Sequence, residues 1–258
     1  MQNIDALFIV EPVLIIGFSL ALVLYWNRKR PIGWVVPAFA LLAYGGAIAA
    51  KVLFQYLTAP ILLTLTSSDW LLGLYLGLQT VVFEVGGAFL VARFAVSRRK
   101  MDGKDAEAYG LSLALWENGG LLGAIALINV LYYAAVISSG GPMADNLYTL
   151  LSKTQPQLFY SPLEAMPILA WGLLERVSSL LVHFSWGYLC VKSVYPHKRK
   201  YLFVALPMGM IDFLVPFVQV LTVPTFESVV FVFGVACLII SLEATRPMKR
   251  SSQKKGKS

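Results

Sequence analysis

The sequence predicts an all-α, polytopic membrane protein: a bundle of seven transmembrane helices with its N-terminus outside and its C-terminus in the cytoplasm. Composition is the first reason, since 58% of the 258 residues are hydrophobic and the mean hydropathy is +0.71. That leaves too little polar surface to coat a soluble globule. The other reasons are a series of apolar stretches, each near the roughly 20 residues that span a bilayer, and basic residues gathered between alternate stretches.

Seven apolar stretches account for most of the chain. They cover residues 7–26, 33–57, 70–92, 108–137, 165–191, 201–221 and 226–244. The first follows Asp5 and Glu11 and has neither a basic leader region nor a small-residue cleavage site, so it is expected to stay in the membrane. Residues 138–164 form a long outside segment, expected to be a linker, with a lid over the bundle as the alternative. We expect one membrane domain, residues 1–245, and a disordered basic cytoplasmic tail, residues 246–258.

Basic residues set the expected orientation. Eighteen of the 21 lysines and arginines follow the first, third, fifth and seventh stretches. They are Arg28, Lys29, Arg30, Arg93, Arg98, Arg99, Lys100, Lys104, Lys192, Lys198, Arg199, Lys200, Arg246, Lys249, Arg250, Lys254, Lys255 and Lys257. Because cytoplasmic segments carry the excess of basic residues, these four groups are assigned to the inside. The net charge of +7 is therefore first a signal of topology, with some attraction to anionic lipids.

The positions of the basic residues also limit which kinds of partner the protein is expected to bind. Nucleic-acid binding is disfavoured, because the basic residues sit beside span ends and no interleaved aromatic platform accompanies them. Cys190 and Cys237 both fall inside apolar stretches and are expected to be packed free thiols. The expected surroundings are membrane lipids, and the expected location is the plasma membrane of a prokaryote.

Among the ionisable residues within the apolar stretches, seven are candidates for a shared site. They are Lys51, Glu84, Glu117, Glu175, Arg176, His183 and Asp212. A charge at bilayer depth costs at least about 2.5 to 3.5 kcal/mol, and such groups usually face one another or a wet cavity. We therefore predict that they converge on a shared polar site. The alternative is a set of separate structural pairs, such as Lys51 with Glu84 and Arg176 with Asp212.

Spacing along each helix indicates which of these groups share a face. Glu175, Ser179 and His183 follow one another at intervals of four, so one face of the fifth span carries an acid, a hydroxyl and a base. Glu84 lies on a stripe of small residues in the third span, which favours close approach of a neighbouring helix. In the sixth span Pro207 and Pro216 flank Asp212 and are expected to distort the helix there.

Short motifs at these polar positions follow a recognisable order. The third span reads FEVGG over residues 83–87, at the position of a Glu-Glu-x-x-Arg motif in one family of membrane proteins. The fourth reads YGLSLALWE over residues 109–117, against Tyr-Gly-x-Gly-His-Gly-Gly-x-Glu. The fifth has Glu175-Arg176 followed by His183, and the sixth reads MGMID over 208–212, against His-x-x-x-Asn. On these residues the chain resembles the YhfC-like family of glutamic-type intramembrane proteases, relatives of PrsW and of the CAAX prenyl endopeptidases.

The resemblance implies a catalytic set and also a set of losses. The retained positions, and so the candidate catalytic residues, are Glu84, Glu117, Glu175, Arg176, His183 and Asp212. The replaced positions are Phe83 for the first Glu, Gly87 for the Arg, and Leu113 and Met208 for two histidines. A glutamic hydrolase needs a carboxylate base for water and donors or a metal for the developing oxyanion. Losing two histidines removes groups suited to the second task.

Two functional classes follow. In the first, the protein is a divergent protease in which Glu84 or Glu117 activates water and His183, with Arg176, stabilises the oxyanion. Zinc is kept as an alternative cofactor, with His183 and Asp212 among its ligands. In the second, favoured by the lost positions, it is a non-catalytic scaffold that binds a transmembrane client or a partner subunit. The resemblance extends to the anterior-pharynx-defective scaffold subunit of gamma-secretase, to which the segment HFSWG over residues 183–187 is similar.

Two further classes of seven-helix protein are less well supported. A retinal-binding photoreceptor or pump needs a lysine in the last span, and residues 226–244 contain none. A transporter remains an alternative, although the paired broken helices that usually mark one are missing.

Overall fold

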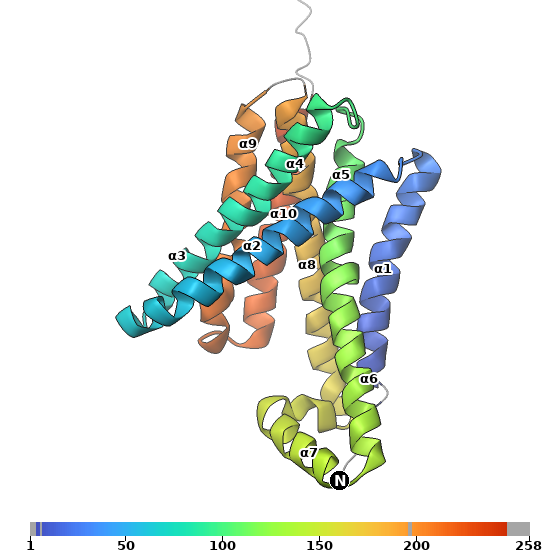
Figure 1. The fold of residues 1–258 in the computed structure, drawn as a ribbon, viewed down its shortest axis with the longest axis vertical. Coiled ribbons are helices and arrows are strands. Elements are labelled where there is room, and N and C mark those ends of the chain that lie inside the picture. Colours follow the sequence, from blue (N-terminus) through green and yellow to red (C-terminus); the bar gives the residue numbers. More distant parts are fainter. Residues whose placement is uncertain (1–3, 6, 196–197, 247–258) are drawn as a thin grey trace, which may run out of the picture.

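The computed structural model describes residues 4–5, 7–195 and 198–246, and its regular structure is entirely helical (Figure 1). Seven helices in this part of the chain are long and apolar enough to cross a membrane, which confirms the predicted fold class. The predicted tail, residues 246–258, lies outside the described residues from position 247 onward. Its disorder and the orientation of the bundle stay predictions.

The crossing helices are continuous or assembled from shorter elements. In chain order they are α1 (Leu7–Lys29); α2 (Val35–Leu65); a third made of α3 (Asp69–Gln79), η1 (Thr80–Val85) and α4 (Gly86–Ser97); a fourth made of α5 (Ala106–Leu115), η2 (Trp116–Gly123) and α6 (Ala124–Ser139); α8 (Pro162–Val194); a sixth made of α9 (Lys200–Ala205) and η4 (Leu206–Gln219); and α10 (Val223–Thr245). The fourth and fifth are joined through α7 (Pro142–Thr154) and the short 3₁₀ turn η3 (Pro156–Phe159).

Several helices extend beyond the apolar stretches read from the sequence. α2 continues through Pro60 to Leu65, because the chain stays apolar there and membrane helices tolerate an internal proline. α1 begins at Leu7, as the apolar stretch 7–26 does, so Glu11 lies inside the first span and not ahead of it. The third, fourth and fifth helices are likewise longer than the predicted stretches.

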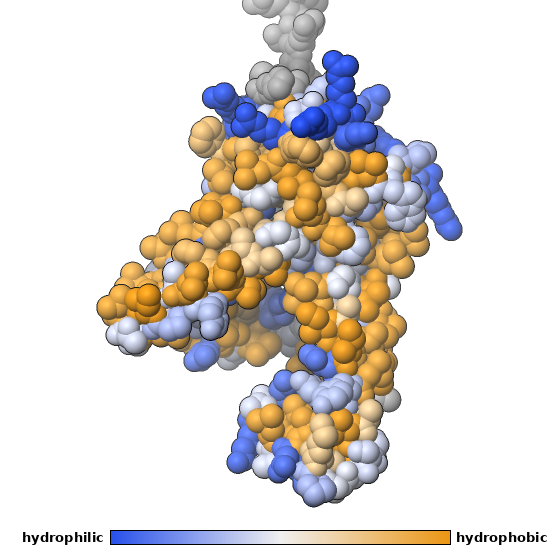
Figure 2. Space-filling view, in the orientation of Figure 1, coloured by the Kyte–Doolittle hydropathy of each residue, from blue (hydrophilic) through white to orange (hydrophobic). Residues whose placement is uncertain are grey.

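Polar surface is concentrated at one end of the molecule, which we call the basic end. Figure 2 shows hydrophilic residues capping the top of the view and mainly hydrophobic ones over the body below. The end of α1, the turn between α4 and α5, the start of α9 and the end of α10 meet there (Figure 1). The described residues of all four basic groups adjoin these elements, as the positive-inside rule requires of a single membrane face.

The opposite end carries a folded segment in place of the expected linker. Gly140 and Gly141, with φ of 69° and 85°, turn the chain into α7, a conformation that suits glycine. Leu151 of α7 and Leu158 of η3 are buried against the lower part of the bundle, in a cluster that includes Phe8 and Val130. Residues 138–164 are thus packed against the bundle as a small helical cap.

Glycines bring the central helices close together. α5 and α8 pack so tightly that a Cβ at Gly110 would lie 2.5 Å from the carbonyl oxygen of Phe184. Likewise a Cβ at Gly209 of η4 would lie 2.8 Å from the backbone nitrogen of Val81 in η1. Small residues permit such contact between membrane helices, where lipid supplies no hydrophobic drive. These two contacts fix the elements that carry most of the ionisable side chains.

Candidate functional site

All seven intramembrane ionisable residues predicted from the sequence line one cavity, which we call the polar cavity. Its volume is about 280 Å³. The charged side chains in its wall are Lys51 from α2, Glu84 from η1, Glu117 from η2, Glu175, Arg176 and His183 from α8, and Asp212 from η4. Most of them lie about 12 residues from the basic end of their helices, roughly 18 Å along an α-helix axis. The cavity is therefore near the middle of the bilayer-spanning region.

The first group of contacts is centred on Lys51 and is called the lysine cluster. The Lys51 Nζ atom donates hydrogen bonds of 2.7 Å to Thr80 Oγ1, Glu84 Oε1 and Asp212 Oδ2. Thr80 Oγ1 in turn donates to Asp212 Oδ2 at 2.5 Å. The Lys51 and Glu84 side chains are 13% and 8% exposed, so this is a largely buried ion pair with a second carboxylate attached. An ammonium group with three donors is fully satisfied by these three acceptors.

The second group is centred on His183 and is called the histidine cluster. His183 Nδ1 lies 2.5 Å from Glu117 Oε2, and Nε2 lies 3.3 Å from Glu84 Oε2. Ser179 Oγ donates to the same Glu117 oxygen at 2.7 Å. The sequence predicted that Ser179 and His183 share one face of α8. It did not predict that the acid they both contact is Glu117, from the neighbouring helix. Glu84 joins the two clusters through its two oxygens.

Arg176 and Glu175 form a separate pair at the edge of the cavity. Their side chains are in contact with each other, and Glu175 is 42% exposed against 17% for Arg176. The structure thus contains the expected Lys51–Glu84 pair but joins Arg176 to Glu175 and gives it no ion pair with Asp212 among the described residues. Asn118 also bonds to α8 here, by donating to the Arg176 carbonyl oxygen at 3.3 Å.

Three of the four acids lie where regular α-helical geometry is interrupted. Glu84 and Glu117 are on the π-helical segments η1 and η2, and Asp212 is on the 3₁₀ segment η4, which contains Pro207 and Pro216. A π-helical turn adds a residue to the turn and shifts the side chains that follow onto another face, and it is found frequently at functional sites. The distortion of the sixth span was expected from its prolines. The two π-helical segments were not.

Sequence reasoning missed several residues of the site. The ring of Tyr44 lies edge-on to His183 with centroids 5.9 Å apart, and that of Trp186 does so at 4.1 Å. Neither is charged at neutral pH, and an aromatic residue in an apolar stretch gives no distinguishing signal. Glu227 of α10, which is not among the cavity-lining residues, is 6% exposed and its Oε2 has no hydrogen-bond partner among the described residues. An acid inside the last apolar stretch was a signal that the sequence analysis did not use.

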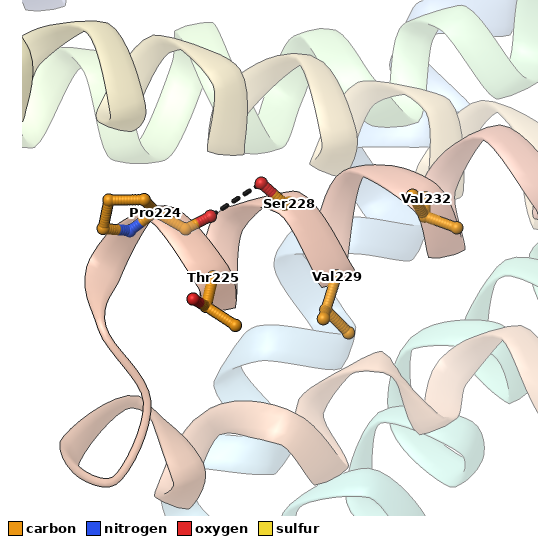
Figure 3. Close-up of a pocket in the computed structure, with 5 residues that line it drawn as sticks. All are labelled: Pro224, Thr225, Ser228, Val229 and Val232. Atoms are coloured by element: carbon orange, nitrogen blue, oxygen red, sulfur yellow. Dashed lines mark hydrogen bonds between the residues drawn. The ribbon is translucent and has the colours of Figure 1, made fainter.

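A second depression lies on the outer surface of α10. Figure 3 shows its lining residues, in which the Ser228 hydroxyl bonds to the carbonyl oxygen of Pro224 within the same helix. Its volume is about 520 Å³ and its lining residues are Pro224, Thr225, Ser228, Val229 and Val232. Because none of these side chains is ionisable, it is a weaker candidate for a chemical site than the polar cavity.

Comparison with known proteins places this site in a family. A family model described as YhfC intramembrane metalloprotease matches residues 13–233. No curated protein and no solved structure matches the chain significantly. The matched region runs from the first crossing helix into the last and includes all seven charged residues of the polar cavity. Since the match covers most of the sequence, the chain belongs to the YhfC intramembrane metalloprotease family.

Proposed function

We propose that this protein is a non-catalytic member of its family that binds a transmembrane segment of a client or partner subunit at the polar cavity. The observation that carries the proposal is that both carboxylate oxygens of Glu84 are already occupied. Oε1 accepts a hydrogen bond from Lys51 at 2.7 Å, and Oε2 lies 3.3 Å from His183 Nε2. A carboxylate held by an ammonium group and an imidazole is less available to take a proton from water, which is the task of a general base.

The packing around the replaced motif positions supports the same conclusion. Leu113 and Met208, which stand where the resemblance has histidines, are 2% and 3% exposed and belong to the hydrophobic core. A Cβ at Gly87 would lie 3.5 Å from the Ala47 side chain, so this position packs directly against α2. These positions are built into the apolar packing and supply no oxyanion donor.

The metal ion that the family description names does not fit these donors. Both ring nitrogens of His183 face carboxylates, and Asp212 Oδ2 is held by Lys51 and Thr80. In the described part of the chain, no group of three or more His, Cys, Asp or Glu side chains is arranged to hold a metal ion. We therefore assign neither His183 nor Asp212 as a zinc ligand and route no chemical step through a metal.

Access and charge favour a membrane-embedded ligand. Figure 2 shows the molecule hollowed in its lower half, between the projecting ends of α2 and α3 and the column formed by α6 and α7. A lateral opening of this kind admits a helix from the lipid. The cavity carries four acidic and three basic groups, of which the imidazole is charged only when protonated. We infer that it prefers a segment with a basic or amide side chain in its apolar stretch.

Peptide-bond hydrolysis is the second candidate function. The observation that favours it is the position of Glu117, whose Oε1 accepts no hydrogen bond from the described residues while its side chain lines the cavity beside His183. In that mechanism Glu117 takes a proton from water, the resulting hydroxide attacks the scissile carbonyl carbon, and Arg176 stabilises the oxyanion. The tetrahedral intermediate then collapses with cleavage of the C–N bond, and Glu117 returns the proton to the leaving amine. Losing one preorganised oxyanion donor typically costs about 10²–10³ in rate, so the replaced histidines weigh against this mechanism.

The two candidates are separated by testing binding and cleavage together in liposomes. A photo-crosslinking residue at Val215, which lines the polar cavity, is expected to capture transmembrane peptides that carry a central lysine more efficiently than all-apolar ones. The same residue at Val232, on the outer face of α10 and 66% exposed, is the matched control. Equal capture at both positions would contradict binding in the cavity.

Cleavage of the same peptides is measured with the wild type and with Glu117→Gln, Glu84→Gln and His183→Ala. No turnover is expected from any of them. Turnover by the wild type that disappears in Glu117→Gln, while the melting temperature of that variant is unchanged, would overturn the non-catalytic proposal. Glu243→Gln, which changes an exposed acid near the end of α10, controls for loss of charge alone.

A further inference from the structure

We infer that the Lys51 ammonium group is a built-in cation, held in an oxygen cage that takes a divalent metal ion once this side chain is shortened. The cage consists of Thr80 Oγ1, Glu84 Oε1 and Asp212 Oδ2, each 2.7 Å from Nζ. This inference does not depend on whether the polar cavity binds or cleaves a client.

The cage is assembled by the fold and not by one flexible side chain. Thr80 and Glu84 come from η1 and Asp212 from η4, two segments that meet through the close contact at Gly209. Thr80 also donates to Asp212 at 2.5 Å, which holds the hydroxyl and the carboxylate together independently of Lys51. Lys51 enters from a third helix, α2. Removing its side chain therefore leaves the oxygen atoms in place.

Two nearby carboxylates at this depth need a positive charge between them. Glu84 is 8% exposed and Asp212 31%. Moving an unpaired charge from water to a buried position costs several kcal/mol. In the wild type this charge is covalently attached, so neither a chelator nor a change in metal concentration removes it. The family description names a metal, whereas this chain supplies a lysine in contact with two of the retained acids.

The chemistry of the cage specifies which ion would replace the lysine. All three donors are oxygen atoms, two of them carboxylates, and such sets favour Mn²⁺, Mg²⁺ or Ca²⁺ over zinc. The adjoining cavity of about 280 Å³ leaves room for water molecules to complete the coordination. Mn²⁺ is the useful probe because its binding is detected directly by electron paramagnetic resonance.

The experiment compares Lys51→Ala, Lys51→Met and the wild type, purified in detergent. We expect Mn²⁺ to bind Lys51→Ala stoichiometrically and to raise its melting temperature by roughly 5 °C at a hundred-fold excess over the dissociation constant. The wild type should show neither effect and should melt at the same temperature with a chelator. Lys51→Met, which fills the space without a charge, should bind Mn²⁺ much more weakly than Lys51→Ala.

Two controls keep the result specific. Lys192→Ala removes a lysine whose Nζ donates to the Gly103 carbonyl oxygen at 2.8 Å and which forms no ion pair among the described residues, and should not gain Mn²⁺ binding. Adding Asp212→Asn to Lys51→Ala should abolish the binding. Mn²⁺ bound stoichiometrically by the wild type, or a folded Lys51→Ala that binds none, would overturn the inference. If Lys51→Ala does not fold without metal, rescue of its folding by Mn²⁺ supports the inference, and failure of that rescue counts against it.

Discussion

At the scale of single residues, His183 holds the centre of the site together. Its imidazole separates Glu84 from Glu117, with nitrogen atoms 3.3 Å and 2.5 Å from their oxygens, and the rings of Tyr44 and Trp186 pack against it. The side chain is 6% exposed, so water cannot replace it readily. The arrangement lets two acids from different helices share one partner.

Replacing His183 by alanine is therefore expected to destabilise the protein strongly. Glu117 would keep only the Ser179 hydroxyl as a donor and Glu84 would lose the partner of its second oxygen. Breaking a buried pair in this way costs about 3 to 5 kcal/mol. Combined with Glu117→Gln, the loss should be smaller than the sum of the two single effects, because the second change removes the unpaired acid. Melting temperatures of the two single variants and the double variant measure this coupling.

A matched variant separates that coupling from simple loss of packing. Ser185→Ala alters another buried residue of α8, whose hydroxyl bonds only to the Leu181 carbonyl oxygen at 2.6 Å. Its effect should add to that of Glu117→Gln. Additivity for His183→Ala as well would contradict the role given to the imidazole.

The charged residues of the polar cavity were largely predictable from the sequence, whereas the side chains that they contact were not. An ionisable group in an apolar stretch is conspicuous because of its cost in lipid, and this argument identified Lys51 and Asp212 without any structure. Which acid meets which base depends on the rotation of each helix about its axis. That rotation changes at the π-helical segments, so periodicity gave no means to join His183 to Glu117.

At the scale of elements, the close contact between η1 and η4 sets the position of Asp212. Gly209→Ala would place a Cβ 2.8 Å from the backbone nitrogen of Val81 and so push η4 away. We expect a loss of about 1 to 3 kcal/mol in stability. Gly17→Ala is the matched control, because a Cβ at Gly17 meets nothing within 4 Å and should leave stability unchanged or slightly raised.

Thermal unfolding in detergent compares the two glycine variants directly. A Gly209→Ala protein as stable as Gly17→Ala would mean that η4 and η1 are not held in the close contact described above. The number of crossing helices, by contrast, was available from the sequence, because hydropathy reports burial in lipid whatever the local helix type. Helix ends were less accurate, as α2 shows, since an apolar run beyond Pro60 has no polar residue to mark its end.

At the scale of the whole molecule, the basic end predicts the orientation in the membrane. Since cytoplasmic segments carry the excess of lysine and arginine, this end is expected to face the cytoplasm. A reporter fused after Ser258 should behave as cytoplasmic, and one inserted at Gly141 should behave as external. The opposite pair of readings would reverse the orientation, and the gathering of basic residues at one end would then need another cause.

The helical cap at the other end could not be predicted from the sequence. Residues 138–164 contain polar residues, glycines and prolines that are typical of a linker, and their mean hydropathy is too low for a span. They fold because α7 and η3 bury Leu151 and Leu158 against the lower bundle. Such burial depends on a surface made by other helices, which no local pattern reveals.

The length of α2 has a consequence for the surrounding lipid. Its 31 residues extend about 46 Å, against a hydrocarbon thickness of about 30 Å. The helix runs obliquely past the upright ones, and its last apolar residues, among them Ile61 and Leu65, are 61% and 77% exposed (Figure 1). Hydrophobic mismatch of this size is relieved by tilt and by deformation of the bilayer. Lipid beside the polar cavity is therefore disturbed on one side of the protein, which shortens the apolar path between water and the buried charges.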